Sequence, residues 1–167
     1  FAVDSYPAAG SYALAAGAAA FDETGGNGSV GVIAGTGCAW NVTNTNSWIA
    51  ITSGAGGTGN GAVNFIVSPN GGSASRTGLV VIAGQNFTVS QAAAPCSYVI
   101  LPTEQAHGAG AETGAIGLTT LGGCAWTAGA STNWITITTA SSSAGSATIG
   151  YSVSANLTSI GRTGEVL

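Results

Sequence analysis

Two short stretches decide the fold: Gly37-Cys38-Ala39-Trp40 and, after a polar turn, Trp48-Ile49-Ala50-Ile51-Thr52. Both return 86 residues later, as Gly123-Cys124-Ala125-Trp126 and Trp134-Ile135-Thr136-Ile137-Thr138. When residues 1–81 are aligned with residues 87–167 at this offset, without a gap, about 25 of the 81 pairs are identical. This identity indicates a tandem duplication. The chain of 167 residues therefore predicts two copies of one module. Each copy has roughly 80 residues, which is enough to fold.

Charged residues are scarce, at 5% of the chain, where an ordinary soluble domain has about a quarter. The only cations are Arg76 and Arg162. The chain thus offers neither the basic surface that nucleic acid needs nor a polybasic segment for anionic membranes. No apolar run reaches the roughly 18 residues of a membrane helix. We expect no nucleic-acid partner and no membrane insertion.

The first residue is Phe1 rather than Met, so we expect either a mature chain whose signal peptide has been removed or a fragment of a longer protein. Apart from the apolar residues, the chain is mostly uncharged Gly, Ser, Thr and Asn, which suits a secreted protein. The predicted location is therefore extracellular or on the cell surface.

Alternating apolar and polar residues, interrupted by turn residues every 8 to 12 positions, predict seven short strands in the first module. These strands are expected at 11–14, 29–34, 38–43, 48–53, 62–68, 76–82 and 87–91. The glycine-rich residues 54–61 are expected to form a loop. The pattern is typical of an all-β protein made of two tandem immunoglobulin-like β-sandwiches. The first module is expected at 11–94 and the second at 95–167, with residues 1–10 in front of both.

Three cysteines predict one disulfide and one unpaired thiol. Cys96 and Cys124 both fall in the second module, whereas the first module has Gly10 in the position of Cys96. We therefore expect a Cys96–Cys124 bridge and a free, buried Cys38. A three-cysteine metal site is the alternative, but it has only His107 to complete it and no close cysteine spacing. We expect no metal and no cofactor.

Catalytic constellations are weak. The only adjacent acidic pair, Asp22-Glu23, lies along a predicted turn, whereas a glycosidase needs two carboxylates that face each other across the sugar. The single histidine, His107, is expected in a loop or at a rim, and no Ser-His-acid set is recognisable. We predict no catalytic residue and no enzyme activity.

Four tryptophans are candidate sugar-stacking platforms or core residues. Trp48 and Trp134 are expected in the core, and Trp40 and Trp126 are the weak candidates for glycan binding. Arg76 and Arg162, each before Thr-Gly, are expected to pair with backbone carbonyls near a turn.

The order of these motifs resembles the BACON family, which are bacterial immunoglobulin-like repeats of secreted and surface proteins. The motifs are Cys-Ala-Trp, Trp-Ile-x-Ile-Thr, a Gly/Ser loop, Val-Ser-x-Asn, Arg-Thr-Gly and a final Gly-Gln-x-Phe-Thr-Val-Ser-Gln. The complete pattern runs from Ser11 to Gln91, and the second copy matches from Ser97 to Leu167. The resemblance implies an extracellular β-sandwich. Carbohydrate binding has been proposed for the family, but no binding residue can be mapped from it onto this chain.

One strand is out of place. The second module reaches Leu167, in register with Val81, so it lacks a counterpart of the closing strand Phe87–Gln91. The stretch Phe1–Ser5 lies 86 residues before that closing strand and has the same pattern. Insertion of this strand into the second module of the next molecule would complete the sandwich, as in donor-strand assembly.

The residues predicted to make this polymer contact are Phe1, Val3, Ser5, Val166 and Leu167. The contact would be heterologous and would propagate as a filament of identical subunits. An equally open interpretation is that the sequence is a window cut from a longer repeat array. A third is that Phe1–Ser5 folds back onto the second module of its own chain. This third interpretation is less favoured, because two modules strung end to end would keep the two termini apart. The leading hypothesis is an extracellular structural protein assembled head to tail, and the alternative is a carbohydrate-binding or adhesion module.

Overall fold

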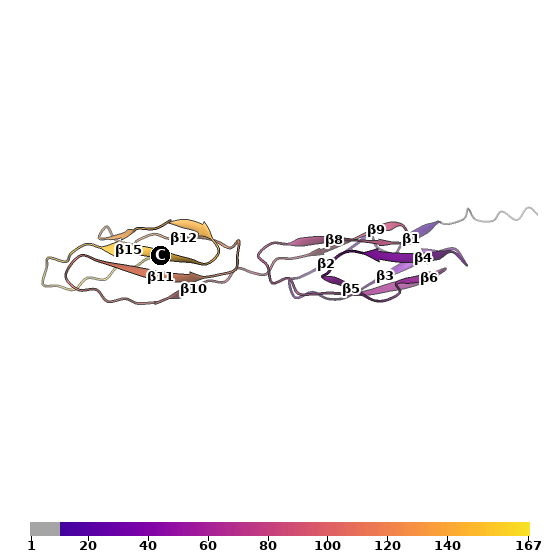
Figure 1. The fold of residues 1–167 in the computed structure, drawn as a ribbon, viewed down its shortest axis with the longest axis horizontal. Helices are drawn as coiled ribbons and strands as arrows, with labels where there is room; N and C mark the ends of the chain where they lie inside the picture. Colours follow the sequence, from indigo (N-terminus) through magenta and orange to yellow (C-terminus); the bar gives the residue numbers. More distant parts are fainter. Residues whose placement is uncertain (1–10) are drawn as a thin grey trace, which may run out of the picture. The chain divides into compact units, whose positions relative to one another are not determined.

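The structure is a computed structural model, and it describes residues 11–167. Over these residues it is built of strands without a helix, as the sequence predicted, and it divides into two compact units between Ala94 and Pro95. Figure 1 shows each unit as layered β-structure. The all-β, sandwich-type prediction is confirmed.

The first unit contains nine strands within the described residues. They are β1 (Tyr12–Leu14), β2 (Ala18–Phe21), β3 (Gly26–Ala34), β4 (Ala39–Asn44), β5 (Ile49–Ser53), β6 (Gly56–Thr58), β7 (Gly61–Val67), β8 (Arg76–Ile82) and β9 (Gln85–Gln91). They form two sheets, with the orders β1-β3-β7-β5 and β2-β9-β8-β4-β6. Strand β9 thus lies between β8, to which it is antiparallel, and β2, to which it is parallel.

The core of the first unit lies between these two sheets. Alternate side chains of β7, β8 and β9 are buried, because successive residues of a strand point to opposite faces of its sheet. In Figure 1, β8 and β9 run along one layer of this unit and β5 along the other. The most deeply buried core side chains are Val32, Val63, Val67, Val80, Ile82, Phe87 and Val89.

The second unit repeats this plan with six strands. They are β10 (Val99–Leu101), β11 (Glu112–Thr119), β12 (Ala125–Thr127), β13 (Ile135–Ile137), β14 (Ser142–Ala144) and β15 (Ala147–Val153). One sheet has the order β10-β11-β15-β13, and β12 pairs with β14 in the other. The register is conserved between the units, since Val30 pairs with Val63 and Ile116, 86 residues later, pairs with Ile149.

The last residues of the second unit take the position of β8. Ala130 and Val166 form an isolated antiparallel bridge, the counterpart of the pair Asn44 and Val80. Gly129 and Leu167 exchange two backbone hydrogen bonds of 2.8 Å. A counterpart of β9 is not present among residues 95–167.

Two details differ from the sequence-based expectation. The residues expected to form a glycine-rich loop contain β6, and the alanine-rich start of the first unit contains β2. Glycine in β6 has a packing reason: a Cβ at Gly57 would lie 2.7 Å from the Trp40 ring. Glycine there therefore makes room for an indole on the paired strand rather than marking a loop.

No helix within residues 11–167 is long and apolar enough to cross a membrane.

Candidate functional site

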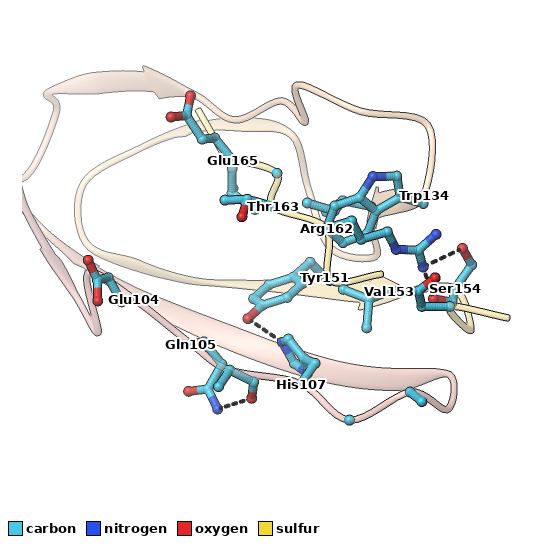
Figure 2. A pocket seen from close by; sticks show the side chains of 18 of the residues that line it. Glu104, Gln105, His107, Trp134, Tyr151, Val153, Ser154, Arg162, Thr163 and Glu165 are labelled. Atoms are coloured by element: carbon cyan, nitrogen blue, oxygen red, sulfur yellow. Dashed lines mark hydrogen bonds between the residues drawn. The ribbon is translucent and has the colours of Figure 1, made fainter. Parts of the chain in front are cut away.

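A groove with a volume of about 850 Å³ opens in the second unit. One wall is the segment 102–109, and the opposite wall is the segment 158–166. Between them the apolar side chains of Ile135, Tyr151 and Val153 line the groove. Figure 2 shows Glu104 and Gln105 on one side, Thr163 and Glu165 on the other, and Tyr151 between them.

The first unit has a strand in the corresponding place. Its walls are β2 and β8, and β9 pairs with both. Residues 104–107 correspond to β2 by the 86-residue offset, and residues 162–167 correspond to 76–81 of β8. Both segments line the groove, so the groove occupies the position of β9. In the first unit this position is filled by Phe87 and Val89, which are 1% and 0% exposed.

The core of the second unit is correspondingly less covered. Val30 and Val80 of the first unit are buried, whereas their counterparts Ile116 and Val166 are half-buried. The groove is therefore a gap in a sandwich layer with an apolar base, and its walls are irregular segments with one isolated bridge at Val166.

His107 lies at the edge of the groove. Its Nε2 lies 3.0 Å from the hydroxyl of Tyr151, and its Nδ1 lies 3.0 Å from Oε2 of Glu112. The other carboxylate oxygen of Glu112 accepts a hydrogen bond from the backbone N–H of Gly108. The hydrogen bond from His107, followed by that from Gly108, lowers the pKa of the Glu112 carboxyl. The His107 side chain is 15% exposed, in agreement with the prediction of a rim residue.

Arg162 stacks on Trp134 at another part of the groove wall. Its Cζ lies 4.3 Å from the ring centroid, and its guanidinium donates to the backbone carbonyl of Ser154. Arg76 and Trp48 repeat this arrangement in the first unit at 4.4 Å, with Arg76 donating to the carbonyls of Ser68 and Pro69. The carbonyl pairing expected for both arginines is present, and the cation–π contact was not foreseen.

The cysteines form one bridged pair and one free thiol within the described residues. Cys96 and Cys124 form the disulfide. Cys38 is free and half-buried, so the prediction that it is fully buried was wrong. Cys38 lies just after the turn between β3 and β4 and stays partly open, whereas Cys124 is bonded to Cys96 and is 1% exposed.

The tryptophan assignment requires a correction. Trp40 and Trp126, the candidates for glycan binding, are each 8% exposed and belong to the cores. Their indole Nε1–H groups donate to the carbonyls of Gly59 and Gly145, at 2.9 and 2.8 Å. Neither ring offers a face to a sugar. Trp48 and Trp134, expected in the core, lie at its edge: each is partly buried against a core cluster and also contacts an arginine.

The predicted polymer-contact residues fall into two groups. Phe1, Val3 and Ser5 lie outside the described residues. Val166 is half-buried beside Ala130, and Leu167 is 68% exposed next to it. The sequence pointed to the end of this wall and placed His107 at a rim, but it missed Tyr151 and Glu112 as the partners of His107. The missed signal is that His107 and Tyr151 replace Phe21 and Phe65 of the first unit.

Residues 39–92 match the family model BACON, described as "Putative binding domain, N-terminal", and residues 98–166 match the model BACON_2, described as "Viral BACON domain". The chain belongs to the BACON family. It consists of two tandem BACON-type domains, which confirms the resemblance inferred from the motifs. The match to the first BACON domain includes β9, and the match to the second includes both walls of the groove. No curated protein matches the chain.

Proposed function

We propose that the chain is a structural, strand-accepting subunit of an extracellular protein, joined head to tail with identical subunits. In this proposal the groove of the second BACON domain receives a β-strand, and the segment Phe1–Ser5 of another subunit supplies it. The observation that carries the proposal is the groove itself, which has the walls and the place of β9.

Burial of apolar surface is the main free energy available to such a contact. In the first domain β9 buries Phe87 and Val89 almost completely. Full burial of one such side chain contributes about 1.5–3 kcal/mol. A strand also provides backbone N–H and C=O partners to both walls, as when a peptide extends a sheet. An unfilled groove leaves these groups and the apolar base open to association.

The contact is heterologous, since it joins a head segment to a groove near the tail. Repetition of a heterologous contact gives a filament unless the rotation between subunits closes a ring. The disulfide supports an extracellular location, because such bonds persist in oxidising compartments. We also take the chain to be non-catalytic, in keeping with a family described as a binding domain.

A glycan-binding role was the alternative. It loses its two candidate residues, because Trp40 and Trp126 are buried. The description of the family as a "Putative binding domain" supports a binding role in general, and Trp134, partly exposed in the groove, is the aromatic side chain that remains available for it.

The direct test is deletion of Phe1–Ser5, followed by size-exclusion chromatography with light scattering over a range of concentrations. The full chain is expected to form species that are multiples of 16.0 kDa, and the deletion variant is expected to be monomeric. A matched control replaces Ala8 and Ala9 by serine, which changes the same head segment but leaves Phe1–Ser5 intact. Equal assembly of the deletion variant and the full chain would refute the proposed function.

A further inference from the structure

Three aromatic rings form a stack in the core of the first domain. The centroids of Phe21 and Phe65 are 6.0 Å apart with an interplanar angle of 70°, and those of Phe65 and Phe87 are 5.7 Å apart at 66°. These are edge-to-face arrangements, which aromatic pairs favour. Phe87 comes from β9, so the closing strand contributes the third ring.

Gly28 makes room for this stack. A Cβ at this position would lie 2.3 Å from the Phe65 ring and 3.0 Å from the Phe21 ring. Any larger residue would collide with the central ring. The glycine and the three rings therefore form one packing unit.

The second domain contains the same unit without its third ring. His107 and Tyr151 take the positions of Phe21 and Phe65, with ring centroids 5.6 Å apart at 86°. Gly114 takes the position of Gly28, and its Cβ would lie 2.4 Å from the Tyr151 ring. The position of Phe87 lies in the groove, where no described residue fills it.

We propose that Tyr151, His107 and Gly114 form a ring site that selects an aromatic side chain of the incoming strand, and that Phe1 of a second copy occupies it. This inference rests on the proposed function and adds the feature by which the groove recognises its strand. Phe1 lies 86 residues before Phe87, so the register that places Phe87 on Phe65 places Phe1 on Tyr151. Val3 then takes the place of Val89.

The pairing of β8 with β9 in the first domain predicts the rest of this register. Val80 pairs with Phe87 and Gly78 with Val89. With the offset applied, Phe1 lies opposite Val166 and Val3 opposite Gly164. Gly164 suits this position, because it is only half-exposed and packs against Trp134.

Hydrogen bonding prepares the ring site before a strand arrives. The hydroxyl of Tyr151 is held by His107, which is held in turn by Glu112. The Tyr151 ring is thereby oriented, although its neighbouring ring position is empty within residues 11–167. A leucine at the head of the strand would bury apolar area but would not form the edge-to-face contact.

The test uses the full chain carrying Phe1→Ala as the receiving protein and a synthetic peptide with the sequence of residues 1–6 as the probe. Binding is followed by the fluorescence of Trp134, which lines the groove. A Phe1→Ala peptide is expected to bind roughly 10- to 100-fold more weakly, because it loses a buried ring. A Phe1→Leu peptide is expected to fall between the two, and an Ala2→Ser peptide, changed on the outward face, is expected to bind like the parent.

Equal binding of the parent peptide and the Phe1→Leu peptide would overturn the ring site, since any large apolar side chain would then suffice. If deletion of Phe1–Ser5 abolishes assembly while Phe1→Ala does not, the ring site is wrong and the proposed function stands. If deletion leaves assembly unchanged, both fall. On the receiving side, Tyr151→Phe keeps the ring but loses the contact of its hydroxyl with His107, so it is expected to weaken binding modestly. His107→Ala loses both this contact and the ring contact and is expected to weaken binding more, by at least severalfold. Unchanged binding after His107→Ala would contradict the role given to that residue.

Discussion

Trp40 shows how a single residue changes its role when packing is considered. The short Cys-Ala-Trp motif gave no periodicity from which to decide its orientation. In the fold the indole is covered by glycines of β6 and β7, since a Cβ at Gly57 or Gly61 would lie within 2.7 Å of its ring. For Trp48 the alternation of the strand does indicate the orientation. Ile49 is buried, so its neighbour Trp48 points away from the core centre and lies at the rim under Arg76.

Substitution of Trp40 by alanine should therefore destabilise the first domain. Loss of a buried Trp costs about 3–5 kcal/mol in the free energy of unfolding. Differential scanning calorimetry would report this as a lower transition temperature of one domain only. The control is Leu79→Ala, on the outward face of β8 at 47% exposure, which should shift that transition far less. A transition unchanged by Trp40→Ala would contradict the core assignment.

Glu112 predicts a pH dependence of the second domain. Hydrogen bonds from His107 and Gly108 hold the pKa of its carboxyl below the usual value of 4.5. A carboxyl with a depressed folded-state pKa contributes stability that is fully present above its unfolded pKa and is lost as the pH falls through the folded one. The Glu112→Gln variant should therefore lose less stability than the parent between pH 5 and 3. Urea unfolding at several pH values measures this, and parallel curves for the two proteins would contradict it.

At the scale of elements, β8 and its counterpart explain the Arg-Thr-Gly motif. Arg76 covers the Trp48 ring, and Gly78 lies against Cζ2 at the edge of the same ring, so two residues of the motif contact one tryptophan. The sequence showed that Arg-Thr-Gly and Trp-Ile recur together, but not that they touch. That contact is set by the pairing of β4 with β8, which no local pattern reveals.

Gly78→Ala tests this contact. The added Cβ would lie 2.8 Å from both Cζ2 of Trp48 and Oδ1 of Asn46. Overpacking of this kind costs typically about 1–3 kcal/mol. The matched control is Gly71→Ala, where nothing lies within 4 Å. Urea unfolding should separate the two variants, and equal stability would show that the tryptophan adapts.

Long alternating strands and the short β1 were predictable from sequence, but short strands made of turn-type residues were not. The strand expected at 76–82 is β8, and 62–68 differs from β7 by one residue at each end. Three-residue strands such as β6 and β14 consist mainly of Gly, Ser and Thr, and Gly and Ser are residues typical of turns. They become strands only because β4 and β12 offer them partners.

Across the whole molecule, the 86-residue repeat was the most informative signal. The repeat alone predicts the register of both domains and the position at which residues 95–167 lack a strand. It could not reveal the ring site, because His107 and Tyr151 differ in chemistry from Phe21 and Phe65. The replacement of Phe21 and Phe65 by His107 and Tyr151 can be interpreted only from the structure, which shows that the two rings of each pair are in contact.

The disulfide distinguishes the two domains energetically. Cys96 and Cys124 are 28 residues apart, and within the described residues only the second domain has a bridge. Closure of a loop of this length stabilises by about 3.5 kcal/mol in the chain-entropy model. Reduction should lower the transition temperature of the second domain alone, whereas Cys38→Ser should change neither bridge nor domain stability greatly. Calorimetry with and without reductant measures this, and an unchanged second transition would contradict it.

The central claim is that the strand Phe1–Ser5 of one molecule lies in the groove of another, and a cysteine cross-link tests it most directly. In the first domain Leu79 pairs with Thr88, so Glu165 should lie opposite Ala2 of the neighbour. In a Cys38→Ser background, Ala2→Cys with Glu165→Cys should form intermolecular disulfides under mild oxidation. Val3→Cys with Glu165→Cys, which places the two thiols on opposite faces, should not. On a non-reducing gel, we predict a ladder of cross-linked species for the Ala2→Cys, Glu165→Cys pair and none for the Val3→Cys, Glu165→Cys pair. Monomer alone for both pairs, or equal ladders from both, would contradict strand insertion.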